Sequence, residues 1–156
     1  MYARQVDGEY ISLESSLPSA CHWVAPLPAA ESRYAFACAD GKVYSGHVFL
    51  ADKLEISIKK TLVESESYKS GIQRIIFGDF DGNGEIDLAI LRQDNKLQIW
   101  QLFQNEPVLR YESKSEDGFG KILSICVSKQ KRAEIIVVTF SGWAFQLGLF
   151  KEKESR

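Results

Sequence analysis

The chain repeats its own pattern, and this repeat restricts its possible folds more than any other feature. Moved forward by 47 positions without a gap, residues 71–103 match a later segment: the aliphatic run 88–91 falls on the run 135–138, and the turn pair Asp94-Asn95 falls on Ser141-Gly142. Moved back by 54 positions, the pair Asp94-Asn95 falls on Asp40-Gly41. Repeats of this length are typical of arrays of one supersecondary unit. We therefore predict three copies, approximately residues 9–50, 54–103 and 107–150.

Each copy contains short β-favouring runs separated by turn residues. Asp40-Gly41 between two such runs is a strong hairpin signal, and residues 54–58 alternate apolar and polar side chains as a half-exposed strand does. No sustained helical periodicity is visible. Four strands per unit and a period of about 45–55 residues are typical of propeller blades. We therefore expect an all-β fold, with three four-stranded blades of a partial β-propeller forming a single domain over residues 1–156.

Three blades do not close a propeller. Known propellers close with about four to eight blades, and an open array leaves strand edges and apolar flanks uncovered. We therefore expect the chain to be part of a longer propeller, or to meet other protein subunits that supply or cover the missing blades.

One loop of the middle copy carries metal-binding chemistry. Between Gly78 and Asp87, oxygen-bearing side chains stand at relative positions 1, 3, 5 and 9, and Gly82 and Gly84 suit a tightly curled backbone. Calcium takes six to eight oxygen ligands, and this spacing can turn them inward. We predict a Ca²⁺ site formed by Asp79, Asp81, Asn83, Glu85 through its backbone carbonyl, and Asp87.

Two loop families open in this way. An EF-hand needs a glutamate at position 12 and a following helix, but position 12 here is Ile90 in a β-favouring run. Asp-x-Asp-x-Asn-Gly-x-x-Asp between the apolar runs 72–77 and 88–91 resembles the FG-GAP repeat of integrin α-chain propellers. It is also similar to repeats of intracellular proteins such as the Bardet-Biedl propeller subunits and FG-GAP scaffold proteins.

That resemblance implies that the loop joins the two inner strands of a blade and that the same five residues occupy the ligand positions. The alternative is a long hairpin whose Asp, Asn and Gly residues serve only as turn chemistry. The other two copies lose nearly all of these carboxylates, so we expect one metal site at most.

Composition bounds the cellular setting. A net charge of −2 and a pI of about 5.7 favour neither nucleic acid nor an anionic membrane surface as a partner. No run approaches the ~18 apolar residues of a membrane span, so we expect no membrane insertion. We expect an intracellular, cytoplasmic protein, with a cilium-associated or nuclear location as narrower alternatives.

Cysteine and tryptophan residues lie on or beside the apolar runs. Cys21, Cys38 and Cys126 are odd in number and widely spaced, so we expect free thiols that behave as small core residues. We expect the tryptophans to pack between blades, and an exposed one would be a candidate interface anchor. These are Trp23, Trp100 and Trp143.

No enzyme motif is visible, and we expect that the protein is not an enzyme. A basic cluster, Lys129, Lys131 and Arg132, is a candidate interaction site for an acidic partner, while nucleic acid is not expected. The function favoured is a non-catalytic protein–protein interaction scaffold, part of a β-propeller in an intracellular multiprotein complex. The alternative is a calcium-regulated binding module that uses the 79–87 loop.

Overall fold

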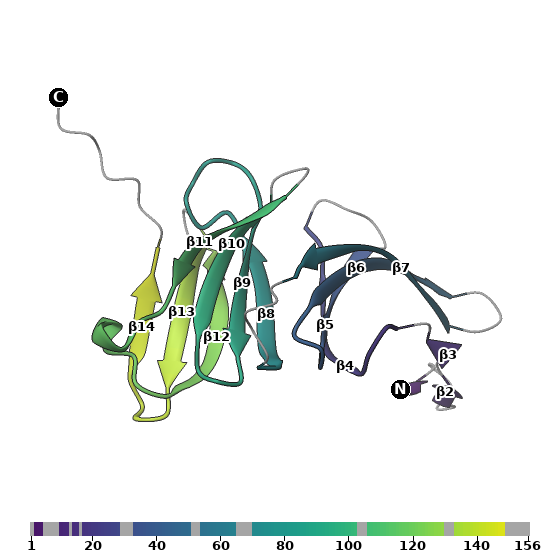
Figure 1. The fold of residues 1–156 in the computed structure, drawn as a ribbon, viewed down its shortest axis with the longest axis horizontal. Helices are drawn as coiled ribbons and strands as arrows, with labels where there is room; N and C mark the ends of the chain where they lie inside the picture. The colour runs from purple at the N-terminus through teal and green to yellow at the C-terminus, as the bar shows by residue number, and fades with distance from the viewer. Residues whose placement is uncertain are drawn as a thin grey trace. The chain divides into compact units, whose positions relative to one another are not determined.

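The structure is a computed structural model of the chain. It describes residues 2–4, 10–12, 14–15, 17–28, 33–50, 54–64, 70–102, 106–129 and 133–148. These residues form fourteen strands and one short 3-10 helix, so the all-β prediction is confirmed (Figure 1). None of the described segments forms a helix with the length and hydrophobicity that crossing a bilayer requires. The chain divides into an N-terminal unit, Met1–Lys69, and a C-terminal unit, Ser70–Arg156.

The N-terminal unit contains a five-stranded sheet and a small hairpin. The order in the sheet is β3-β7-β6-β5-β4, with β3 parallel to β7 and the other pairs antiparallel. One face buries a cluster around Phe36, Tyr44 and Ile56. The strands are β1 (Tyr2–Arg4) and β2 (Tyr10–Ser12) in the hairpin, then β3 (Glu14–Ser15), β4 (Cys21–Pro26), β5 (Arg33–Cys38), β6 (Val43–Leu50) and β7 (Leu54–Val63).

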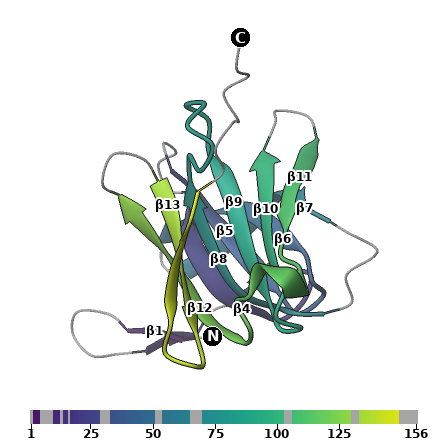
Figure 2. The same ribbon diagram turned by 90° about the vertical axis from the view of Figure 1, so that its left-hand side faces the viewer.

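The C-terminal unit contains two antiparallel sheets, with orders β11-β10-β9-β8 and β12-β13-β14 (Figure 2). One apolar core joins them, because Leu91 and Ile99 of the first sheet cluster with Ile125 and Val137 of the second. The elements are β8 (Ile72–Gly78), β9 (Asp87–Arg92), β10 (Leu97–Leu102), β11 (Pro107–Glu112), the 3-10 helix η1 (Ser115–Asp117), β12 (Ile122–Lys129), β13 (Ala133–Thr139) and β14 (Ala144–Leu147).

Polar contacts also join the two sheets of this unit at strands β8 and β12. Gln73 donates from Nε2 to the Leu123 carbonyl over 3.0 Å, and Arg74 donates from Nη1 to the Ser124 hydroxyl over 2.5 Å. The innermost strands of the two sheets therefore lie side by side, as the inner strands of neighbouring blades do.

The three predicted turns share one hydrogen-bond pattern. Residues Gly41, Asn95 and Gly142 have φ of 78°, 72° and 87°, and each donates its N–H to the carbonyl three residues earlier. In each case the N–H of that earlier residue bonds the carbonyl four residues ahead, as Arg92 does with Lys96 over 2.9 Å. The repeat seen in the sequence is thus a repeat of one hairpin geometry.

The sheets are offset from the sequence copies by one strand. Strand β7 opens the second sequence copy but pairs with β6, and β11 opens the third copy but pairs with β10. Each of these sheets therefore takes its outer strand from the copy that follows. The expectation of three blades of a partial β-propeller is confirmed. Besides the two-stranded sheet β1-β2, the described strands form blade sheets of five, four and three, because β3 adds to β7 and β14 has no further partner among the described residues.

The cysteine expectation is also wrong. Cys21 and Cys38 stand opposite one another on β4 and β5 and form a disulfide, and Cys126 is an exposed free thiol rather than a core residue. The sequence separation of 17 residues gave no sign of this pair, because strand register is what places the two thiols together.

Candidate functional site

The acidic loop connects β8 to β9, and the strand pairing ends at Gly78 and Asp87. Gly82 and Gly84 have φ of 73° and 89°, as expected for glycines that allow a tightly curled backbone. Phe80 is buried in the core between the two sheets of the C-terminal unit, although it lies inside a polar loop. The loop is therefore anchored to the packing of the sheets.

Three carboxylates converge in this loop. One oxygen each of Asp79, Asp81 and Asp87 lie within 4.8 Å of one another. Asp87 is 1% exposed, while Asp79 and Asp81 are half-buried. These three predicted ligands are thus brought together by the fold.

Backbone amides hold the two outer carboxylates in place. Asn83 donates its N–H to Oδ1 of Asp79 and to Oδ1 of Asp81, each over 3.0 Å. Gly84 donates its N–H to the other oxygen of Asp79 over 3.0 Å. Such amide donors compensate part of the negative charge and fix the direction of the oxygens.

The third carboxylate has an unusual electrostatic environment. Burial, followed by the charges of Asp81 and Asp79, raises the pKa of Asp87 to about 6, although the Phe80 N–H donates to its Oδ2 over 3.0 Å and opposes this. Three clustered carboxylates repel one another unless a positive charge lies between them. The donor set is entirely oxygen, which is the preference of a hard divalent cation such as Ca²⁺.

The other two predicted ligands have different surroundings. The side-chain carbonyl of Asn83 accepts the N–H of Glu85 over 2.7 Å, and its amide group donates to Asp81 over 3.0 Å. The ligand roles of Asn83 and of the Glu85 carbonyl stay predictions.

In the predicted basic cluster, Lys129 ends β12, and Lys131 and Arg132 lie outside the described residues.

A buried charged residue was missed in the sequence. Arg92 is fully buried at the end of β9, where its Nε donates to Gln98 Oε1 over 2.8 Å. Gln98 in turn donates to Glu112, which also pairs with Lys96 at 3.0 Å. These hydrogen bonds offset part of the cost of burying the Arg92 charge. The only sequence signal was a single cation ending an apolar run.

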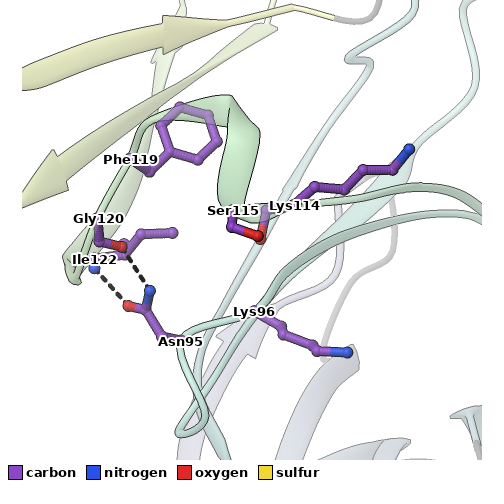
Figure 3. A pocket seen from close by; sticks show the side chains of 8 residues that line it. Asn95, Lys96, Lys114, Ser115, Phe119, Gly120 and Ile122 are labelled. Carbon is purple, nitrogen blue, oxygen red and sulfur yellow. Dashed lines mark hydrogen bonds between the residues drawn. The ribbon is translucent and has the colours of Figure 1, made fainter.

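A cavity of about 340 Å³ lies at the boundary of the two C-terminal sheets (Figure 3). Asn95 forms one edge, and its amide donates to the Gly120 carbonyl over 2.6 Å while its side-chain oxygen accepts the Ile122 N–H. Phe119 and Lys114 also line this space. Because the Asn95 side chain reaches from the β9–β10 turn of the first sheet to Gly120 and Ile122 beside the second, we interpret the cavity as part of their junction.

Two aromatic side chains are exposed on the β13–β14 turn. Phe140 and Trp143 are each 70% exposed, and Lys121 Nζ lies 5.1 Å from the centre of the Phe140 ring. Trp100 is buried and Trp23 half-buried. Of the three tryptophans, Trp143 is therefore the candidate interface anchor.

Comparison with known proteins gives a family for this fold. Residues 3–148 match the family model described as the BBS7 beta-propeller. A mouse protein, the BBSome complex member BBS7, is 31% identical over 87 residues, which are 55% of this chain and 12% of the mouse protein. The chain thus spans a small part of the relative that it matches. Since the family model covers nearly all of the chain, the protein belongs to the BBS7 beta-propeller family.

Proposed function

We propose that the chain is a non-catalytic protein interaction unit, the propeller part of a subunit in an intracellular multiprotein complex of the BBSome kind. The observation that carries this proposal is the family match over residues 3–148. The mouse relative is described as a member of the BBSome complex, and a shared propeller favours a shared way of assembling. The proposal keeps the expectation of an intracellular, cilium-associated location.

The exposed aromatic pair supports an interaction role. Large aromatic side chains are enriched among the residues that dominate binding energy, and most soluble surfaces expose few of them. Phe140 and Trp143 adjoin β14, which has one strand partner among the described residues. A partner that contacts this turn would cover both rings.

The test uses the complete protein expressed in its own cells. We expect it to sediment with other subunits, and we expect Phe140→Ser with Trp143→Ser to weaken assembly about tenfold or more, because truncating an anchor costs about 2 kcal/mol or more. Val24→Ser, at a side chain that is 49% exposed in the N-terminal unit, is the matched control. Sedimentation of the parent protein as a lone chain would contradict the proposal.

A second candidate function is calcium binding by the 79–87 loop, in keeping with the FG-GAP resemblance. The convergence of Asp79, Asp81 and Asp87 favours it. Bound Ca²⁺ would supply positive charge to these carboxylates, and the chain would contribute fixed oxygens held by the Asn83 and Gly84 amides. Because Phe80 ties the loop to the core, ordering of the loop would stabilise the junction of the two sheets.

The calcium proposal is tested by melting the protein in Ca²⁺ and in chelator. Saturation at 100 times the dissociation constant should stabilise the folded state by about 2.7 kcal/mol. Asp79→Ala with Asp81→Ala should remove this difference. Glu85→Gln, which keeps the backbone carbonyl and removes an exposed charge of the same loop, should preserve it. An equal melting temperature of the parent with and without Ca²⁺ would contradict the proposal.

Regulation by calcium needs a further measurement. If the loop controls a partner surface, the affinity of the complete protein for its co-sedimenting subunits should fall when chelator is added. If calcium changes the melting temperature but leaves that affinity unchanged, the ion has a structural role only.

A further inference from the structure

The N-terminal unit carries a second cavity, of about 480 Å³, on the sheet formed by β5, β6 and β7. Three of its lining side chains are cationic, namely Arg33, Lys59 and Lys60, and all three are exposed. No aspartate or glutamate lines it among the residues that the structure describes. Since the chain as a whole has a net charge of −2, this lining concentrates positive charge against the overall balance.

Strand pairing explains why these residues share one face. Arg33 on β5 stands opposite His47 on β6, and Ser45 stands opposite Lys60 on β7. The register of β6 and β7 shifts between Ser45 and Gly46, so that Lys59 is the extra residue of a bulge beside Lys60. Bulges redirect side chains in this way, and here two adjacent lysines line the same cavity.

Gly46 allows the close backbone approach beneath this cavity. A Cβ at Gly46 would lie 2.6 Å from the Ser57 carbonyl oxygen, so no other residue fits without a shift of the backbone. The half-buried His47 stacks on Phe49 with ring centres 5.5 Å apart, which fixes the imidazole within the lining. The cavity thus has closely packed backbone at its base and exposed cationic side chains at its rim.

The distribution of charge indicates the kind of ligand. Arg33 lies on β5, and Lys59 and Lys60 lie on β7. Strand β6 stands between them, so the two strands are roughly 10 Å apart at about 4.8 Å between neighbouring strands. A single phosphate would need its donors gathered at one point, whereas several carboxylates along an extended segment match separated charges. Leu27 and Leu62 also line the cavity and can contact aliphatic side chains between the carboxylates. An arginine can bind a carboxylate with two parallel hydrogen bonds.

We propose that this cavity, which we call the basic cavity, binds an acidic, leucine-containing segment of a protein partner, with Arg33, Lys59 and Lys60 pairing its carboxylates. The inference rests on the proposed interaction function and names the chemistry of one partner. Attraction between the basic cavity and an acidic segment also accelerates encounter at low salt.

The test measures binding of a fluorescein-labelled hexapeptide of alternating glutamate pairs and leucines to the full chain by fluorescence anisotropy. We expect saturable binding that weakens as salt is added, and no binding of the same peptide with glutamine in place of glutamate. Arg33→Glu with Lys60→Glu should weaken binding by about tenfold or more. Lys114→Glu with Lys121→Glu makes the same change of charge on exposed residues of the other unit and should leave binding unchanged.

Three results would overturn the inference. They are equal loss of binding in both double variants, equal binding of the glutamine peptide, and binding of inorganic phosphate or of vesicles containing phosphatidylinositol phosphates in preference to the peptide. Melting curves of both double variants check that they are folded. Normal co-sedimentation of the complete protein with its subunits, combined with absence of peptide binding, would reject this inference and leave the proposed function standing.

Discussion

In the C-terminal unit, two sheets share one apolar core that includes Phe80 from the acidic loop, and hydrogen bonds from Gln73, Arg74 and Asn95 cross between the sheets. In the N-terminal unit, a single large sheet buries a smaller described cluster on one face, and a disulfide joins its strands β4 and β5. Both units use the same hairpin turn. The repeat therefore specifies the sheets, whereas residues outside the repeated pattern specify what stabilises each unit.

Equivalent turn positions show this difference most directly. Gly41 and Gly142 occupy the positive-φ position in two turns, and Asn95 occupies it in the middle one. Asparagine tolerates this conformation better than other residues with a Cβ. Its amide reaches Gly120 and Ile122 across the junction, so one side chain converts a turn into a contact between sheets.

The largest effect should come from Phe80→Ala. Removing a buried phenylalanine should lower the free energy of unfolding by about 3–5 kcal/mol. Hydrogen exchange should show the loss in the C-terminal unit, because Phe80 packs in its core. Phe140→Ala, at a side chain that is 70% exposed, is the control and should change stability little. A Phe80→Ala protein as stable as the control would show that the loop is not anchored by this ring.

Loss of the disulfide between Cys21 and Cys38 should destabilise the N-terminal unit. Closing a loop of this length is worth about 3 kcal/mol in the chain-entropy model. Reductant should therefore lower the melting temperature of the parent and have no effect on Cys21→Ala with Cys38→Ala. Thiol titration of the unreduced, denatured protein should find one thiol, that of Cys126. Three titrating thiols would contradict the pairing.

Asn95→Gly should have an intermediate effect. Glycine accepts the φ of 72° without strain, so the change isolates the loss of two hydrogen bonds. We expect destabilisation of about 1–3 kcal/mol by chemical denaturation. Gly142→Asn is the reciprocal variant, and we expect it to be neutral or slightly destabilising. If Asn95→Gly stabilises the protein, the contact between the sheets contributes nothing measurable.

The smallest expected effect is a change in the pKa of Asp117 when Tyr111 is replaced by phenylalanine. Its hydroxyl donates to Asp117 Oδ2 over 2.5 Å, and this bond, followed by the Lys114 N–H, lowers the pKa of Asp117. A carboxyl group whose pKa is lower in the folded protein than in the unfolded protein stabilises the folded state at pH values above the unfolded pKa. This stabilisation is lost as the pH falls through the folded pKa. Tyr111→Phe should raise the Asp117 pKa in an NMR titration, whereas Tyr34→Phe should not. An unchanged pKa would contradict the hydrogen bond.

The sequence by itself determined the all-β class, the three hairpin turns and the acidic loop with its positive-φ glycines. These features are local, because alternation of side chains and turn chemistry depend on residues that are neighbours in the chain. The spacing of Asp79, Asp81 and Asp87 likewise predicted a group of oxygens that the structure brings together. The calcium itself and the remaining two ligands stay predictions.

Tertiary structure alone decided which strands share a sheet and which side chains meet across it. Strand β7 joins β6, Cys21 meets Cys38, and Arg33 meets His47 only because of pairing register. A shift of one residue would send every side chain to the opposite face, and nothing within a single strand fixes that shift. The burial of Phe80 is decided in the same way, since its ring finds a core only when a second sheet packs against the first.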